Sequence, residues 1–385
     1  MYRLNDEQQR IVAKAGDVAT RHIGPRAAQV DQNGSFPTEA IAALGRDGLL
    51  GLTIPASYGG LGQGLRTMAA TLDAVAQHCS STAMVYLMHL CGVACYAAAP
   101  DKTETVLRDA ARGEHLSTVS FSEKGSRSHF WAPVSREARA GGNGAITLTA
   151  SKSFVTSAGH ADSYVVSTLA AGATGPLESS IYLVRRDDPG VTVSGEWRGL
   201  GMRGNASASM TLDGVPVGAD RALSAPGKGL DMMLGVVLPA FQVGTAAVAL
   251  GIAEAAVRGT ITHLTHARLE HMNSTLAELP TLRARLAQMR IETDRARAHL
   301  GSVLDAIDTP GPATQLLVLE AKAAATEAAV SVTDMAMRTC GGAAFGGAHG
   351  LERLFRDARA PIVMAPTSDQ AYDFIGRALC GMEVF

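Results

Sequence analysis

The sequence has no dominant charge of either sign. Its 34 Lys and Arg residues nearly balance its 36 Asp and Glu residues, so the 385-residue chain has a net charge of −2. Binding to a nucleic-acid backbone depends on a basic surface, so this balance argues against a nucleic-acid-binding protein. With 46% hydrophobic and 18% charged residues, the composition is that of a globular chain long enough for more than one domain.

The sequence also lacks paired cysteine motifs. Its five cysteines form no CxxC pair, and Cys91 and Cys95 lie one helical turn apart among apolar residues. This pattern favours buried free thiols over a disulfide framework or a zinc site. His263, His266 and His271 share one helical segment, but we expect them on a solvated face, and no metal site is predicted.

No signal peptide or membrane span is expected from the sequence. The first residues, MYRLNDEQQRIVAKAG, contain no apolar stretch of the kind that signal peptides have. Residues 232–257 are apolar enough to span a bilayer, but Pro239 interrupts them and no basic flank or aromatic belt accompanies them. We expect a buried helix there and a cytoplasmic location for the protein.

Hydrophobic periodicity divides the sequence into three parts. Residues 1–115 have helical periodicity. Residues 116–226 contain short, alternating, β-branched runs such as SYVVSTLA and SSIYLVRR, which predict a β-barrel or sandwich. Residues 227–385 return to long, Ala-rich helices with the spacing of a helical bundle. The predicted class is therefore α+β, with a helical, a β and a helical domain in that order.

Six short strings follow one another along the chain: LTIPASYGGLG, FSEKGSRSH, KSFVTSAGHADSYVV, GLGMRGNASASMTLDGVPV, RTCGGAAF and LERLFRDAR. Together and in this order they resemble the acyl-CoA dehydrogenase family over essentially the whole chain. LTIPASYGGLG is similar to the family turn P-x-x-Y-G-G-x-G, and FSEKGSRSH to the flavin loop T-E-P-G-x-G-S-D. KSFVTSAGHADSYVV resembles K-x-W/F-I-T-N-A-x-x-A-D, and GLGMRGNASASMTLDGVPV resembles the L-G-x-R-x-S strand pair. RTCGGAAF and LERLFRDAR are similar to Q-x-x-G-G-x-G-F and E-R-x-x-R-D-A. The resemblance implies FAD held between a β-barrel and a C-terminal four-helix bundle, in a homotetramer or homodimer.

The resemblance places one set of flavin contacts in the middle of the chain. Ser122 matches the position whose hydroxyl bonds the pyrimidine edge of the flavin, and Ser128 matches a pyrophosphate contact. Phe154, Val155 and Thr156 match the strand along the isoalloxazine, where an aromatic ring stacks and Thr156 bonds near N5. Judged from the residues alone, the same positions could be an ordinary edge strand with turn hydroxyls.

The resemblance places a second set of flavin contacts near the C-terminus, where the family uses a neighbouring subunit. Gly341 and Gly342 match glycines that let the backbone approach a phosphate closely. Arg338 stands where the family has a Gln and offers a cation to the pyrophosphate. Arg268 aligns with a family Arg only with an offset of one residue. The sequence has no GxGxxG between a strand and a helix, so a nicotinamide site is not predicted.

The glutamate that abstracts the substrate's α-proton in the family is missing here. Counting from the RDA motif places it at Ala365, with Pro366 in the place of Gly and Thr367 matching Thr, which we count among the cofactor contacts. We expect Pro366 in the first turn of a helix that follows an extended segment. The family's other glutamate position, with its neighbouring Arg, aligns with Phe241 and Gln242. Alanine and phenylalanine cannot accept a proton.

Asp369 is a candidate substitute for the missing base. We expect it one helical turn after Ala365 on the same helical face. It could equally be a helix N-terminal acid or a contact to the adenine end of FAD. His349 and His89 are further candidates, and Glu123 in the flavin loop matches a structural family glutamate.

Four functions remain open after this comparison. The first is FAD-dependent α,β-oxidation of an acyl-CoA or other acyl thioester, with an atypical base or none, which passes electrons to an acceptor. The second is a flavin-dependent monooxygenase supplied by a flavin reductase, which needs no α-proton base. The third is base-free elimination from an acyl thioester, and the fourth is a non-catalytic flavin-binding partner subunit. We place thioester oxidation first.

Overall fold

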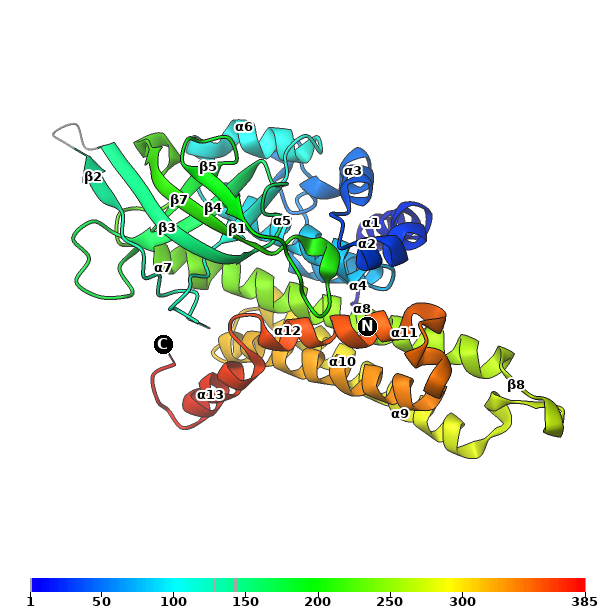
Figure 1. The fold of residues 1–385 in the computed structure, drawn as a ribbon. Coiled ribbons are helices and arrows are strands. Elements are labelled where there is room, and N and C mark those ends of the chain that lie inside the picture. The colour runs from blue at the N-terminus through cyan, green and yellow to red at the C-terminus, as the bar shows by residue number, and fades with distance from the viewer. Residues whose placement is uncertain (1, 128, 141–144, 385) are drawn as a thin grey trace.

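The computed structural model describes residues 2–127, 129–140 and 145–384. Figure 1 shows the N-terminal helices and the β strands together on one side of a long helical bundle. Helical, β and helical parts follow one another along the chain, which confirms the predicted α+β class and its order.

The N-terminal helices surround one helix that is buried along most of its length. The capping residue Asn5 starts the first helix, because its side chain accepts a hydrogen bond from the backbone N–H of Gln8 at 2.9 Å. Helix α5 is apolar nearly all round and is buried as that pattern predicts. The elements are α1 (Asp6–Val18), η1 (Ala19–Ile23), η2 (Gly24–Arg26), α2 (Ala27–Asn33), α3 (Thr38–Arg46), η3 (Leu49–Gly51), η4 (Ala56–Tyr58), α4 (Leu65–Ala76), α5 (Ser80–Ala97) and α6 (Pro100–Ala111).

The β part forms two sheets around a second hydrophobic core. Leu148, Val166, Tyr182 and Leu212 are buried there and come from strands of both sheets. β1 and β4 pair in parallel, and the other pairs in these two sheets are antiparallel. The first sheet has the order β1 (Ser117–Ser120), β4 (Ser163–Leu169), β5 (Ser179–Arg185), and the second β2 (Ala138–Ala140), β3 (Ala145–Val155), β7 (Ala208–Val217), β6 (Val191–Ser194). Short helices η6 (Arg203–Asn205) and η7 (Ala219–Arg221) connect them to their neighbours.

The C-terminal part is a bundle built on α8, α9 and α10 (Figure 1). Helix α8 also packs on α4, and Gly251 allows a close approach there, since a Cβ atom on it would lie 2.6 Å from the Asp73 carbonyl oxygen. The elements are α7 (Gly229–Met232), η8 (Met233–Val237), α8 (Leu238–His266), β8 (Arg268–Leu269), η9 (Glu270–Met272), β9 (Ser274–Thr275), η10 (Leu276–Glu278), α9 (Pro280–Asp308), α10 (Thr314–Phe345), η11 (Ala348–Gly350), α11 (Leu351–Asp357), α12 (Arg359–Val363) and α13 (Ser368–Leu379).

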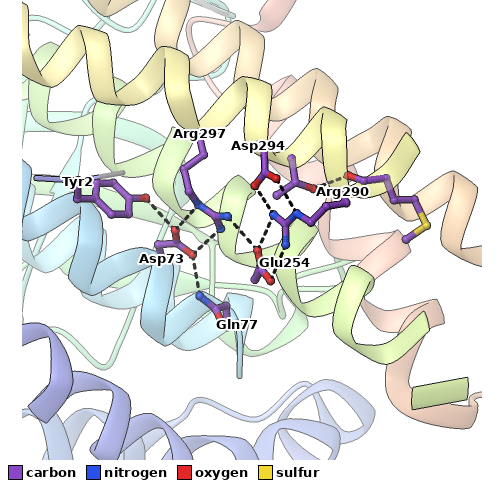
Figure 2. Close-up of polar contacts among 9 residues, drawn as sticks. Tyr2, Asp73, Gln77, Glu254, Arg290, Asp294 and Arg297 are labelled. Carbon is purple, nitrogen blue, oxygen red and sulfur yellow. Dashed lines mark hydrogen bonds and ion pairs between the residues drawn. The ribbon is translucent and has the colours of Figure 1, made fainter. Parts of the chain in front are cut away.

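Buried charged side chains join the N-terminal helices to the bundle (Figure 2). Arg297 on α9 contacts Asp73 on α4 at 3.2 Å and Glu254 on α8 at 2.9 Å. Tyr2 donates a hydrogen bond to Asp73 at 2.8 Å, and Arg290 donates two to Glu254 at 3.0 Å each. Each charge in this cluster therefore has a partner of opposite sign, without which its desolvation would be strongly destabilising.

Two helical stretches are long and apolar enough to cross a membrane, namely residues 80–97 and 229–266. The second contains the apolar segment 232–257 noted in the sequence. Within the chain, 89% and 83% of their most apolar windows are buried, which is the pattern of core helices in a folded protein.

The stretch that precedes Ala365 differs from the expectation. The segment RDARAPIVM was expected to be extended, but α11 and α12 cover most of it and extended backbone begins at Met364. Pro366 does not lie in a helical turn, because α13 begins at Ser368 with Thr367 as its N-cap. Thr367 Oγ1 accepts a hydrogen bond from the Gln370 backbone N–H at 3.2 Å, which explains why the helix starts there.

Candidate functional site

A cavity of about 710 Å³ lies where the β part meets the bundle and α5. One wall is the flavin-loop segment and the end of β3, another is the start of α8, and a third is the segment after α11. Its lining includes Met84, Met88, Val119, Phe121, Ser122, Glu123, Lys124, Gly125, Arg127, Phe130, Ser151, Lys152, Ser153, Phe154, Thr156, Trp197, Asn205, Ser207, Ser209, Val237, Leu238, Phe241, Ala360, Val363, Met364 and Ala365.

The end of β3 directs an aromatic ring to the cavity. The pairing register of β3 with β7 shifts between Lys152 and Val155, and Phe154 in this irregular stretch has a φ of 55°. Such bulges re-aim side chains next to binding sites. As a result the Phe154 ring is 69% exposed and meets Trp197 edge-on at 6.4 Å, whereas Val155 is buried in the β core. Phe154 therefore lines the cavity and Val155 supports it from behind.

Several hydroxyl and amide groups form the polar part of the lining. Thr156 Oγ1 lies 3.0 Å from Ser207 Oγ, and Ser122 also belongs to the lining. Asn205 is 1% exposed, and its Oδ1 is a buried acceptor for which the described residues provide no hydrogen-bond donor. An unsatisfied amide in a cavity wall calls for a ligand that carries a donor. These residues fit a flat ring system with a polar edge.

Glu123 and Lys152 form a buried ion pair in the same wall. Lys152 Nζ donates to Glu123 Oε1 at 2.6 Å, and Glu123 Oε2 accepts from the backbone N–H groups of Val134 and Ser135 at 2.8 and 2.7 Å. Burial alone would raise the pKa of the Glu123 carboxyl, but the Lys152 ammonium and these hydrogen bonds outweigh it and hold the pKa low. Both Glu123 carboxylate oxygens therefore accept hydrogen bonds within the protein, so Glu123 has a structural role and is not a free base.

The opposite wall is apolar. Ala365, Met364, Val363 and Phe241 line it, and Glu123 is the sole carboxylate among the described lining residues. At Ala365 and Phe241, the two positions that were expected to correspond to a glutamate, the cavity therefore meets a methyl and a phenyl group. The site offers ring stacking and hydrogen bonds on one side and hydrocarbon on the other.

Three domain models of one family match the chain. They describe the N-terminal, middle and C-terminal domains of acyl-CoA dehydrogenase and cover residues 5–114, 118–215 and 227–380. The chain belongs to the acyl-CoA dehydrogenase family. The resemblance drawn from the sequence strings is therefore confirmed.

Relatives of full length support this assignment. The chain is 28% identical to the cyclohex-1-ene-1-carbonyl-CoA dehydrogenase of Geobacter metallireducens over 98% of this chain and 99% of the relative. The solved butyryl-CoA dehydrogenase of Megasphaera elsdenii has the same fold, with a TM-score of 0.91, 22% identity, and coverage of 98% and 99% of the two chains. KijD3, solved with FMN and dTDP-3-amino-2,3,6-trideoxy-4-keto-3-methyl-D-glucose, matches with a TM-score of 0.85, 26% identity, and coverage of 99% and 95%.

Members of the acyl-CoA dehydrogenase family are FAD-binding flavoproteins, which confirms the predicted cofactor. In this chain the described residues that would hold the ring are Ser122, Phe154 and Thr156, all of which line the cavity. Val155 lies behind them, and Ser128 lies outside the described residues. Asn205 and Ser207 were not singled out from the sequence, although both stand within the string GLGMRGNASASMTLDGVPV.

The second predicted set of flavin contacts lies elsewhere in the acyl-CoA dehydrogenase fold. Arg268 is exposed in β8, at the end of the bundle opposite to α13 (Figure 1). Arg338 is exposed near the C-terminal end of α10 and pairs with Asp334 at 2.7 Å. Gly341 has a φ of 58° in a kink of the same helix, and Gly342 follows it. These four residues and the cavity are not brought together within one chain.

The candidate substitute bases do not line the cavity. Asp369 is exposed in the first turn of α13, and the expectation that it shares a helical face with Ala365 is wrong because Ala365 precedes the helix. His89 is fully buried, with Nε2 at 2.9 Å from the Leu50 carbonyl oxygen, and burial lowers its pKa to about 4. His349 lies in η11 beside His263, at the far end of the bundle.

Proposed function

We propose that this acyl-CoA dehydrogenase family member is an FAD-dependent oxidoreductase that oxidises an acyl-CoA between its α and β carbons. The observation that carries the proposal is the cavity itself, with a stacking ring and hydroxyls on one wall and hydrocarbon on the other. When bound, FAD supplies a two-electron acceptor for the hydride of the β carbon. The chain's own residues hold the ring edge and align the acyl group.

The hydrocarbon wall limits the substrate that this mechanism can use. With Ala365 and Phe241 where a family glutamate could stand, no side chain at those positions takes up the α-proton. We propose a substrate whose α-hydrogen is already acidic, so that water or buffer can accept the proton. Met84, Met88 and Phe121 supply apolar lining for a compact hydrocarbon acyl group.

Anaerobic titration of the FAD-loaded protein tests this function. A panel of acyl-CoAs with saturated α and β carbons, from butyryl-CoA to members with an electron-withdrawing group next to the α carbon, is added while flavin absorbance is followed. Bleaching by members with an acidic α-hydrogen, faster at higher pH, is the expected result. Failure of every acyl-CoA to bleach the flavin, although dithionite bleaches it, would contradict the proposal.

A flavin-dependent monooxygenase is the second candidate, and two observations favour it. Such a reaction needs no α-proton acceptor, and none was found at Ala365 or Phe241. KijD3, at 26% identity, was solved with FMN and an amino-sugar nucleotide instead of a CoA thioester. Oxygen uptake with reduced flavin from a separate reductase, without bleaching by acyl-CoA, would favour this candidate.

The partners and location follow as further proposals. We infer a homotetramer or homodimer, because a second copy could bring Arg268, Arg338, Gly341 and Gly342 to the flavin of the first. We also propose a cytoplasmic enzyme that passes its electrons to a separate protein acceptor. Sedimentation of the FAD-loaded protein tests the assembly, and a monomer that binds FAD tightly would contradict it.

A further inference from the structure

Lys322 on α10 contacts the backbone on both sides of the cavity-wall residue Ala365. Its Nζ donates hydrogen bonds to the Met364 carbonyl oxygen at 2.9 Å and to the Pro366 carbonyl oxygen at 2.7 Å. The lysine side chain is fully buried and is not among the lining residues. It therefore lies behind the wall and hydrogen-bonds the backbone on either side of Ala365.

A second contact from the same face of α10 also holds the segment that follows Ala365. Thr326, one helical turn after Lys322, places its Oγ1 at 3.2 Å from Ser368 Oγ. Ser368 is the first residue of α13 and is buried. Residues 364–368 are thus fixed to α10 at three points over five positions.

Lys322 is better suited to holding the backbone at residues 364–366 in place than to raising the stability of the fold. No salt bridge involving it occurs among the described residues, and Glu327, the charged group that acts on it, is an exposed residue of the same helix. Burying an ammonium without a carboxylate partner is costly, and an apolar side chain of equal length would fill the space without that cost. What the lysine alone provides is a hydrogen-bond donor for each of the two carbonyl groups.

We propose that Lys322 is a positioning residue that sets the place of residue 365 in the cavity by holding the Met364 and Pro366 carbonyls. This proposal rests on the proposed function only where it predicts an effect of Lys322 on the rate of catalysis. Its structural part concerns the backbone of residues 364–366 and can be measured without any substrate.

Hydrogen exchange measured by mass spectrometry on the FAD-loaded protein tests the structural part. Lys322→Met keeps the length of the side chain and removes both donors. We expect peptides that cover residues 362–372 to exchange at least about tenfold faster, with peptides of α9 unchanged. Lys102→Met is the matched control, because Lys102 also donates to a backbone carbonyl, that of Ala222, but at the surface. Unchanged exchange in residues 362–372 would overturn the proposal.

A second measurement separates positioning from a merely structural role. Ala365→Glu restores a carboxylate at the wall, and its rate of flavin reduction by butyryl-CoA is compared with and without Lys322→Met. We expect Lys322→Met to lower this rate about tenfold or more while butyryl-CoA affinity stays within about twofold, because a displacement near 1 Å is enough for such a loss. An equal rate in both backgrounds would overturn the proposal. If the exchange result holds but no acyl-CoA of the panel bleaches the flavin, the proposed function fails and the positioning role stands.

Discussion

The Lys152 ammonium donates a 2.6 Å hydrogen bond to the Glu123 carboxylate inside the wall of the flavin cavity. The side chains are 0% and 1% exposed, so water does not screen the pair. The Glu123 carboxylate also holds the loop at Val134 and Ser135 through their backbone N–H groups. This ion pair therefore joins β3, which carries Lys152, to the loop that carries Ser122 and Glu123.

Lys152→Met is expected to destabilise the protein strongly. Removing one partner leaves the other charge buried and unpaired, which costs about 3–5 kcal/mol. Urea unfolding followed by circular dichroism measures the loss. The control is Arg198→Met, which breaks the exposed 2.9 Å pair with Glu196 and should cost less than about 1 kcal/mol. Similar small losses for both variants would contradict the buried-pair account.

Thr156→Val is expected to weaken FAD binding about fivefold to tenfold, because it removes one hydroxyl from the polar lining at a net value of about 1 kcal/mol. The substitution is close in shape, so folding should be preserved. Equilibrium dialysis of FAD measures the effect. Thr149→Val on β3, the strand that Thr156 directly follows, is the control, since Thr149 is exposed and lies outside the described lining. Equal losses from the two substitutions would show that the effect is not local to the cavity.

Lys322 is expected to make stability depend on pH. Burial lowers its pKa from 10.5 to about 7, so between these values the unfolded chain holds a proton that the folded chain lacks. Unfolding then takes up a proton, and stability rises with pH through this window. The stability of the natural protein minus that of Lys322→Met should therefore increase from pH 7 to pH 9. Urea midpoints at each pH measure this difference, and a flat or falling difference would contradict it.

The sequence indicates the fold because the burial patterns are regular. Helix α5 is apolar all round and lies in the core, and the alternating runs at 163–169 and 179–185 form β4 and β5 as expected. The short helix α12 was missed because its PIV run resembles an extended segment. Pro361 is tolerated there because the N–H groups of a first helical turn have no partner within the helix.

The candidate site is only partly visible in the sequence. Phe154 and Thr156 could be found because they stand in a recognisable string, and both line the cavity. Trp197 and Lys322 could not, since nothing local in the sequence shows that a loop or a bundle helix folds against that string. The position of Asp369 was misjudged because its helix begins after Ala365 rather than before it.

The comparison of Ala365→Glu with the natural protein tests the central claim most directly, namely that the cavity is a flavin site whose wall lacks its proton acceptor. Both proteins are loaded with FAD and mixed anaerobically with butyryl-CoA in a stopped-flow spectrometer. A positioned general base contributes about 10²–10⁴ in rate, so the substitution is expected to accelerate flavin bleaching by about that factor at pH 8. Equal or slower bleaching by a folded, FAD-saturated Ala365→Glu protein would contradict the account.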